Sequence, residues 1–180
     1  MVDLARNYFE LFQIPMACEV DLKQLACSYR ELQKTVHPDR FAGEGERQQR
    51  LSVQYATHVN EAYDTLRSPL PRMAYLLKLA GRELDMENNT IMDPAFLMEQ
   101  MEVREALSDL RNSSNPEPEL EKMIDKAGDD MDRYQAQFTS FWTAGGEKEL
   151  EKAEAVVRKM QFMVKLTVEL EQLESELLDD

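Results

Sequence analysis

The sequence has little of what builds a disulfide scaffold, a β-sheet protein or a membrane span. Its 180 residues include two cysteines, six glycines and seven prolines. Cys18 and Cys27 cannot make a disulfide scaffold and do not have the spacing of a CxxC metal site, which favours a reducing compartment. The few β-branched runs argue against an all-β fold. No apolar run approaches the ~20 residues that cross a bilayer, and the charged start, MVDLARNYFELF, lacks the apolar segment of a signal peptide. We therefore expect a helical protein of the cytoplasm.

The residues that usually carry catalysis are also scarce. The chain has two histidines, His37 and His58, and neither a glycine-rich phosphate loop nor an HExxH-type metal motif. We expect His58 at the surface or at the edge of the core. Charge runs such as Glu147-Lys148-Glu149 are typical of a solvated helix face. The sequence predicts a protein that is not an enzyme, with no catalytic residue, no metal site and no cofactor.

Charge is distributed unevenly along the chain. Basic and acidic residues balance over residues 1–81, so the whole net charge of −14 falls on residues 82–180. So acidic a chain is a poor candidate for binding nucleic acid or an anionic membrane. The change in composition lies in the polar stretch GRELDMENNTIMDP, which predicts a domain boundary. We expect a first domain over residues 1–81, a linker over 82–93 and a second domain over 94–180.

Two amphipathic helices dominate the first domain, one from Asp21 to Val36 and one from Glu46 to Leu66. Asp21 can cap the first helix and Pro38 ends it. Because only about ten residues join them, the two helices are predicted to pack as an antiparallel pair. An apolar cluster at 8–12 and a short helix from Arg72 to Leu79 flank the pair. The predicted buried residues are Leu22, Leu25, Tyr29, Leu32 and Val36 in one helix and Leu51, Tyr55, Val59, Ala62 and Leu66 in the other.

The loop between the two helices joins an imidazole, a carboxylate and a guanidinium within four residues, His37, Pro38, Asp39 and Arg40. Proline makes the start of the loop rigid, and the tip of a helical hairpin is well placed to reach a partner. Lys23, Arg30 and Lys34 share one stripe of the preceding helix, rotated by roughly 100° from its apolar stripe. One interpretation is a turn beside a solvated helix face. The other is a basic docking face that ends at a charged tip.

The second domain is predicted to be an antiparallel bundle of three helices, which makes the whole chain all-α. Asp93-Pro94 is a helix start signal, and the helix that runs from there to Arg111 has a stripe of Phe96, Val103, Leu107 and Leu110. A second helix is expected from about Glu117 to Trp142, and a long third helix follows Gly145-Gly146. The apolar stripe of the third helix is Val156, Met160, Met163, Leu166, Leu170, Leu173 and Leu177.

The first helix of this bundle is apolar on a second side. Three apolar and three acidic residues share that side: Leu97, Met98, Met101, Glu102, Glu105 and Asp109. A helix with two apolar sides is fully buried or has a second partner, and the carboxylates make full burial unfavourable. Methionine is common at adaptable binding surfaces, but ordinary core packing explains the apolar trio equally well. Phe162 lies off the stripe of the third helix and is better explained, from the residues alone, as a buried aromatic.

Four segments of the chain resemble a known family. Residues 6–80 resemble the J-domain, the module that stimulates DnaK-class chaperone ATPases, because the HPD motif is intact as His37, Pro38 and Asp39 after a basic helix. The segments NYFELFQIP, TVHPDRF, LRSPLPRMAYLLKLAG and DPAFLMEQMEVREAL are similar to the HscB family, the J-type co-chaperones of bacterial iron–sulfur cluster assembly. The family fold implied is an N-terminal J-domain followed by a C-terminal three-helix bundle.

The resemblance also implies partners and sites. In this family the J-domain recruits the DnaK-class ATPase HscA, and the C-terminal domain holds the cluster scaffold IscU. The residues implied for HscA are Lys23, Arg30, Lys34, His37, Pro38, Asp39 and Arg40. The residues implied for IscU are Leu97, Met98, Met101, Glu102, Glu105, Asp109 and Phe162. The family more often has leucine where this chain has Met101, which is a volume-conserving exchange.

The expected function is that of a co-chaperone without catalysis of its own. It would bind IscU, present it to HscA and trigger ATP hydrolysis there, assisting the maturation of iron–sulfur proteins. A general J-protein that serves DnaK is one alternative, although no Gly/Phe-rich linker or paired-cysteine zinc domain follows residue 81. A purely structural helical adaptor is another, and the intact HPD motif argues against it.

Overall fold

The computed structural model describes residues 5–36, 43, 45–85, 93–110, 113 and 115–178. The described residues form seven α-helices and no strand, which confirms the predicted all-α class. The chain folds as two compact units, Met1–Gly81 and Arg82–Asp180. By this division the residues expected to form a linker, 82–93, belong to the second unit. Among the described residues, no helix is long and apolar enough to cross a membrane.

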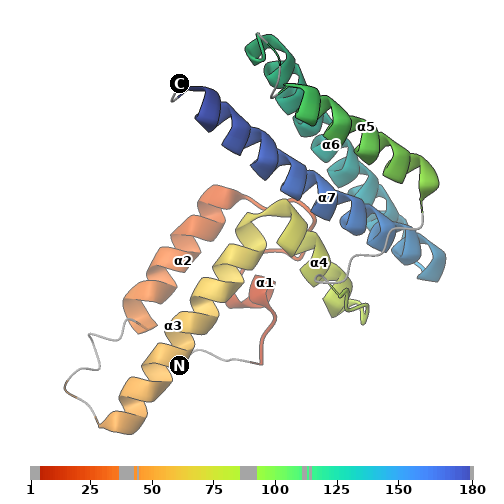
Figure 1. Cartoon of the computed structure of the whole chain (residues 1–180). Coiled ribbons are helices and arrows are strands. Elements are labelled where there is room, and N and C mark those ends of the chain that lie inside the picture. Colours follow the sequence, from red (N-terminus) through yellow and green to blue (C-terminus); the bar gives the residue numbers. More distant parts are fainter. Residues whose placement is uncertain are drawn as a thin grey trace. The chain divides into compact units, whose positions relative to one another are not determined.

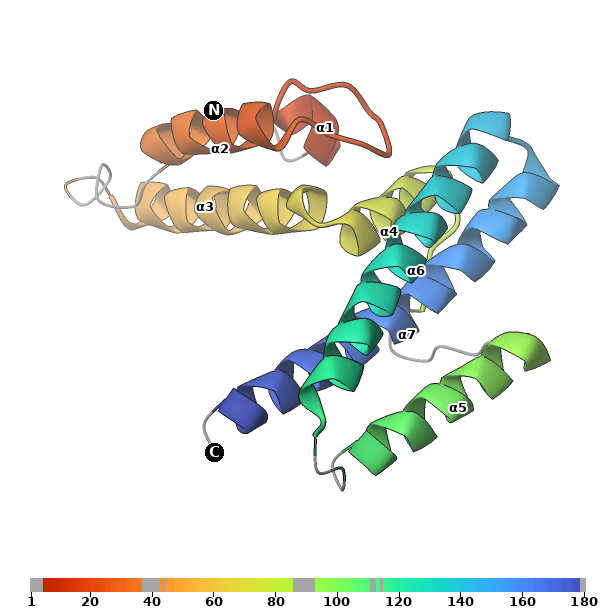
Figure 2. The same ribbon diagram turned by 90° about the horizontal axis from the view of Figure 1, so that it is seen from above.

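The first unit is built around an antiparallel hairpin of α2 (Leu22–Val36) and α3 (Glu46–Arg67) (Figure 1, Figure 2). The Asp21 carboxylate caps α2 as predicted, because it accepts hydrogen bonds from the backbone N–H groups of Lys23 and Gln24. Leu25 is fully buried, but Leu22 is 54 % exposed, so the prediction that Leu22 is core is wrong. The spacing of apolar residues predicts which side of a helix faces the core. It does not predict how much of that side a partner helix covers.

Polar and aromatic side chains fix how the two arms of the hairpin pair. The hydroxyl of Tyr29 donates to Asn60 Oδ1 at 3.0 Å, and the side-chain amide of Gln33 donates to both groups. The rings of Tyr29 and Tyr63 stack with their centroids 4.0 Å apart. These contacts join α2 to α3 one to two turns before α2 ends, so they set the register of the arms that lead to the HPD loop.

Two shorter helices, α1 (Tyr8–Leu11) and α4 (Pro69–Leu79), complete the core of the first unit. The helix α4 begins at Pro69, three residues before the predicted start at Arg72. Proline is tolerated there because the N–H groups of a first helical turn have no intrahelical acceptor. The apolar cluster around α1 contributes the fully buried rings of Phe9 and Phe12.

A buried arginine ties the pieces of this unit together. The Arg72 guanidinium donates to the carbonyl oxygens of Cys18 at 2.7 Å and Leu66 at 2.6 Å. Leu66 lies in the last turn of α3, where carbonyls lack intrahelical donors. Burial lowers the pKa of Arg72 from its usual value, although a neutral arginine is not reached in proteins. Arg72 therefore links the segment before α2 and the end of α3 to α4.

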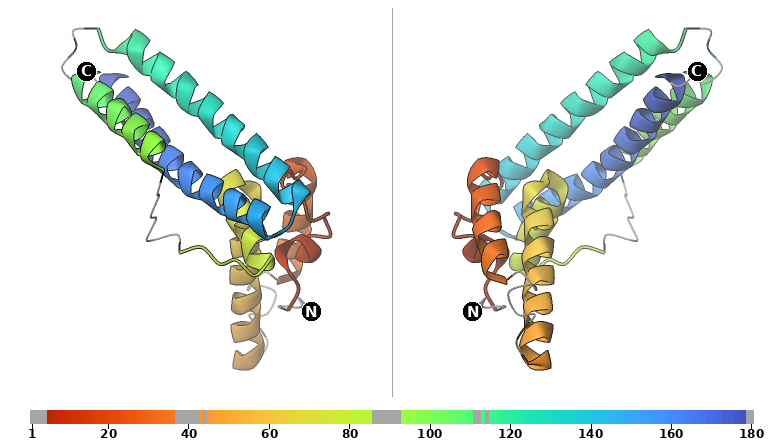
Figure 3. Two further views of the ribbon diagram at one scale, coloured as in Figure 1. Left: turned by 90° about the vertical axis from the view of Figure 1, so that its right-hand side faces the viewer. Right: turned by 90° about the vertical axis from the view of Figure 1, so that its left-hand side faces the viewer.

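In the second unit, α6 (Glu117–Ala144) and α7 (Glu147–Leu178) form a long antiparallel hairpin (Figure 3). The helix α6 runs two residues past the predicted end at Trp142. The turn needs residues with positive φ, which Gly145 (67°) and Gly146 (85°) adopt without strain. The two helices bury a shared core that includes Leu120, Ala127, Tyr134, Phe138, Val156, Val157, Met160, Met163, Leu166, Leu170 and Leu173.

The third helix of the bundle, α5 (Pro94–Leu110), lies along this hairpin (Figure 3). Phe96 packs edge-to-face against Tyr134 of α6 and Phe162 of α7, with ring centroids 6.4 and 5.7 Å away. Leu107 and Leu110 are buried on the same side of α5, as predicted. The predicted stripe therefore faces the hairpin, and the opposite side of α5 faces away from it.

Candidate functional site: two partner-binding surfaces

The outer side of α5 carries an apolar patch. Leu97 is 39 % exposed, Met98 64 % and Met101 72 %, whereas Phe96 is buried. Of the two explanations that the sequence left open for this trio, core packing is therefore wrong. Large apolar side chains gathered on a surface are typical of an interaction site. We refer to Leu97, Met98 and Met101 as the α5 patch.

Charged side chains surround the α5 patch. Glu102, Glu105 and Asp109 are all exposed on the same helix, as the sequence predicted. Arg104 is also exposed and lies three residues after Met101 and seven after Leu97, so it borders the patch on the Leu97 side. The sequence prediction missed Arg104, although this helical spacing was a signal that could have found it. The surface combines an apolar centre with a mostly acidic rim.

Ion pairs hold α5 in place on both of its neighbours. The Asp93 carboxylate accepts a hydrogen bond from the N–H of Phe96 at 3.1 Å and from Lys159 Nζ of α7 at 2.5 Å. The bond from Lys159, and then that from Phe96, lower the pKa of Asp93. On the other side, Lys126 of α6 lies 3.2 Å from Glu99. The α5 patch therefore stands on a helix that ion pairs join to α7 at Asp93 and to α6 at Glu99.

Phe162 lies at the junction of α7 and α5. Its ring meets Phe96 edge-on, at an interplanar angle of 83°, and the residue is half-buried. Lys159 Nζ lies 5.3 Å from the centroid of the same Phe96 ring. The structure thus brings Phe162 to the residue that precedes Leu97, with part of Phe162 still accessible. Phe162 therefore packs against the buried side of α5, and no recorded contact joins it to the α5 patch.

The second candidate surface is the basic stripe of α2. Lys23, Arg30 and Lys34 are all exposed, and Cys27 is exposed on the same stripe. Lys34 pairs with Glu31 at 2.7 Å, but both side chains are more than 65 % exposed, so the pair contributes little to stability. The stripe leads along α2 toward the loop that follows Val36.

The tip residues of the hairpin, His37, Pro38, Asp39 and Arg40, lie outside the described residues. The other histidine, His58, is half-buried at the edge of the core, as expected. Its ring meets Tyr8 edge-to-face, and within the described part of the chain its buried Nε2 has no hydrogen-bond partner. No group of three or more histidine, cysteine or acidic residues among those described could hold a metal ion.

Comparisons with known proteins identify the family of this chain. Residues 92–171 match the family model described as the HSCB C-terminal oligomerisation domain. Over 173 residues the chain is 42 % identical to the co-chaperone protein HscB homolog of Shewanella baltica strain OS195, an alignment that covers 96 % of this chain and 99 % of that protein. The chain belongs to the HscB family of co-chaperones.

Solved structures of HscB proteins share the whole fold. HscB from Vibrio cholerae is 40 % identical, with a TM-score of 0.86 and coverage of 96 % of this chain and 99 % of that one. The human co-chaperone HscB is 28 % identical, with a TM-score of 0.85 and coverage of 96 % and 84 %. The predicted HscB architecture, a J-domain followed by a helical bundle, is confirmed. The J-domain carries the basic stripe, and the bundle carries the α5 patch.

Proposed function

We propose that this HscB-family protein binds the iron–sulfur scaffold IscU, delivers it to the DnaK-class chaperone HscA and stimulates the ATPase of that chaperone. In this way it assists the maturation of iron–sulfur proteins. It acts by binding alone, without a catalytic residue, metal or cofactor of its own. The observation that carries the proposal is the exposure of the α5 patch in a chain of this family.

The α5 patch supports the assignment of the scaffold site. Apolar anchors at the centre of an interface dominate its energy, and the charged residues around them contribute orientation and specificity. Leu97, Met98 and Met101 supply the anchors, and Glu102 and Glu105 supply charge beside them. Such a surface fits a partner with an apolar recess bordered by basic groups.

The J-domain supports the assignment of the chaperone site. Its basic stripe of Lys23, Arg30 and Lys34 suits an acidic surface on the ATPase, and Asp39 would form a charge-assisted hydrogen bond with a partner cation. Because one molecule then holds client and chaperone together, the encounter between them becomes intramolecular and their effective concentration rises.

The test measures ATP hydrolysis by HscA alone, with this protein, with IscU, and with both. We expect stimulation by this protein, a larger stimulation when IscU is also present, and direct binding of IscU in a calorimetric titration. Replacing HscA by DnaK in the same assay should give weaker stimulation. Absence of IscU binding, or equal stimulation of DnaK with and without IscU, would favour a general J-protein instead.

A further inference from the structure

The hairpin of α6 and α7 has two sides on which a further helix can pack, and α5 covers one of them (Figure 3). Lys126 of α6 pairs with Glu99 of α5, so the edge of α6 at Lys126 faces α5. Gly128 follows Lys126 by two residues, which is a rotation of roughly 200° around the helix, so Gly128 lies on the other side. An open groove lies there between α6 and α7. We call it the α6–α7 groove.

The α6–α7 groove is apolar within and has a volume of about 470 Å³. Met131 lines it from α6, and Val164 and Val168 line it from α7. Val164 is 39 % exposed and Val168 is 57 % exposed, so both side chains are partly in contact with solvent. Thr167 also lines the groove, but its hydroxyl donates to the carbonyl of Met163 in its own helix and needs no other partner. An exposed apolar concavity of this kind is typical of a binding site.

A glycine in the wall of the groove has no role in the fold itself. Gly128 is exposed in the interior of α6, where glycine is less favourable than alanine. Its φ is not positive, and a Cβ atom placed there would meet nothing within 4 Å. The helix therefore has room for a side chain at this position. The missing side chain instead lets a ligand approach the backbone of α6 closely.

The charge around the groove is of one sign. The charged residues that line it, among those described, are Asp132 on α6 and Glu171 on α7. The cation nearest to the lining of α7 in sequence is Lys165, which is rotated by roughly 100° from Val164 toward the outer side of the helix. The groove therefore has an apolar centre between two acidic edges, and this pattern is complementary to an apolar ligand with basic edges.

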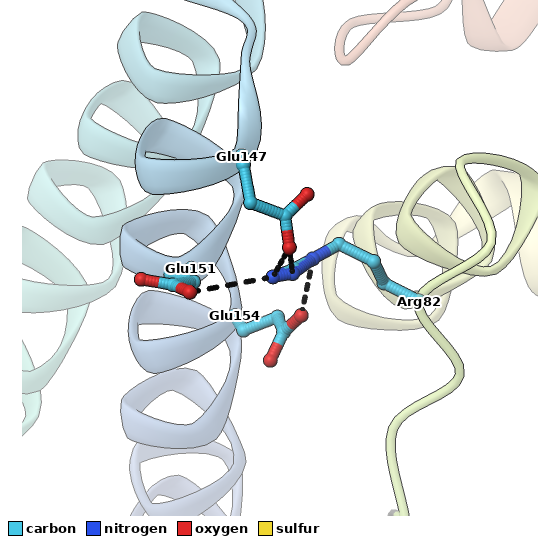
Figure 4. Close-up of polar contacts among 4 residues, drawn as sticks. All are labelled: Arg82, Glu147, Glu151 and Glu154. Carbon is cyan, nitrogen blue, oxygen red and sulfur yellow. Dashed lines mark hydrogen bonds and ion pairs between the residues drawn. The ribbon is translucent and has the colours of Figure 1, made fainter.

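Other carboxylates of the same unit already have a cation. At the start of α7, Arg82 donates to Glu154 at 2.6 Å and to Glu147 at 3.0 Å (Figure 4). Within the described part of the chain, the side chains of Asp132 and Glu171 have neither an ion pair nor a hydrogen bond. Their charge is therefore available to a ligand that brings its own cations. A second copy of this chain, packed groove to groove, would bring further carboxylates instead.

We propose that the α6–α7 groove binds an amphipathic helix of a partner protein, whose apolar side is flanked by lysine or arginine. The groove between two packed helices suits a helix, as α5 shows on the other side of the hairpin, and a fourth helix completes a four-helix bundle. The apolar side chains of the ligand fill the space over Gly128, and its basic side chains pair with Asp132 and Glu171. This surface is distinct from the α5 patch and from the basic stripe, so it adds a partner to the proposed function.

The test uses a synthetic peptide as the probe, with the sequence LKKLLKLLKKLLKL and blocked ends, titrated calorimetrically into the full-length protein. We expect one peptide to bind per chain. Gly128→Leu fills the groove without changing the charge and should weaken binding at least tenfold. The matched control is Gln137→Leu, which adds the same side chain at an exposed position of α6 roughly 180° away and should bind like the wild type.

A second pair of variants separates the groove from a general attraction between a cationic peptide and an acidic protein. Asp132→Lys/Glu171→Lys should weaken peptide binding at least tenfold. Glu169→Lys/Glu176→Lys makes the same change in net charge on the outer side of α7 and should weaken binding less than threefold. Equal losses in the two double variants would show attraction by net charge alone and would overturn the proposal.

The remaining measurements separate this proposal from the proposed function and from loss of folding. Gly128→Leu should melt at or above the wild-type temperature, because the added side chain displaces nothing, and should bind IscU like the wild type. Replacement of Leu97, Met98 and Met101 by alanine should leave peptide binding unchanged. Failure of the wild type to bind IscU would count against the proposed function alone. Failure of the wild type to bind the peptide, or equal binding by Gly128→Leu, would overturn the assignment of the groove.

Discussion

The candidate surfaces of the two units differ in their chemistry. The J-domain comes from a charge-balanced stretch of sequence, and its candidate surface is a basic stripe beside a charged loop. The bundle carries the whole net charge of −14, and its candidate surface is an exposed apolar patch. In a unit without net charge, a local group of cations indicates a candidate binding surface. In an acidic unit one more carboxylate does not distinguish a binding surface, whereas a group of exposed leucine and methionine side chains does.

This difference predicts different physical behaviour. Contacts between exposed charges act mainly on association rates and weaken as salt rises. Apolar anchors act mainly on how long a complex persists, because affinity differences at an interface lie mostly in dissociation. Changes in one unit should therefore leave the partner of the other unit largely unaffected. The predictions below test this division, beginning with the largest expected effect.

The substitution Asp39→Asn in the HPD motif should remove most stimulation of the HscA ATPase and leave IscU binding intact. A hydrogen bond to a charged group contributes about 1.5–3 kcal/mol, which corresponds to roughly a ten- to hundredfold loss when the charge is removed. Steady-state ATP hydrolysis measures the effect. The control is Asp64→Asn, which changes an exposed aspartate paired with Arg67 on α3 and should stimulate normally. Near-normal stimulation by Asp39→Asn would contradict the J-domain mechanism.

Replacement of Leu97, Met98 and Met101 by alanine should weaken IscU binding at least tenfold and leave the melting temperature nearly unchanged. Exposed side chains leave no cavity, whereas each truncation in a core would cost about 2–5 kcal/mol. Calorimetric titration and a thermal melt measure the two effects. The matched control is Val164→Ala/Val168→Ala, which truncates two other exposed apolar residues of the bundle. A large fall in melting temperature, or unchanged IscU affinity, would contradict the assignment of the α5 patch.

Replacement of Lys23, Arg30 and Lys34 by alanine should slow the association with HscA several-fold at low salt and have less effect at high salt. Cys27 supplies an independent measurement, because it is exposed on the same stripe. Alkylation of Cys27 should slow when HscA is bound and should not change when only IscU is bound. Equal protection by IscU would show that the division between the two units is wrong.

In the bundle, the lowered pKa of Asp93 predicts that the protein loses stability in acid. Its bonds from Lys159 and Phe96 favour the carboxylate and hold the folded-state pKa below the usual value of 3.8. The contribution is therefore fully present above about pH 4 and is lost as the pH falls through the lowered pKa. The difference in melting temperature between the wild type and Asp93→Asn should shrink as the pH is lowered below about 4. A difference that stays constant would contradict this role.

In the J-domain, the raised pKa of Tyr8 predicts a small loss of stability in strong base. Burial, and then the neighbouring Glu61, raise the pKa of Tyr8 from 10.0 to about 12. Because the fold favours the neutral phenol, its contribution is present below pH 10 and is lost as the pH rises toward 12. Thermal melts of the wild type and Tyr8→Phe across this range should diverge, with the wild type losing more stability. Parallel curves would contradict the prediction.

Much of the fold could be predicted because its signals are local. The apolar period located the long helices, Asp21 and Asp93 marked two of their starts, and the glycine pair at 145–146 marked a turn. The errors lay where local signals are weak. Leu22 fits the apolar period of α2 but is exposed, and α4 begins at Pro69 although proline usually interrupts helices. The HPD motif and the acidic character of the second half can be identified from the sequence without any knowledge of the fold.

The sequence by itself determined the helices, the division of charge and the motif at 37–39. Only the tertiary structure decided which apolar residues stay at the surface, since periodicity could not separate the α5 patch from core. It also showed the arginines that tie distant segments together, with Arg72 bonded to a carbonyl 54 residues away and Arg82 to a carboxylate 72 residues away. The reason is physical: a helix forms from contacts three or four residues apart, whereas burial and ion pairing depend on which distant side chains the packed helices bring within reach.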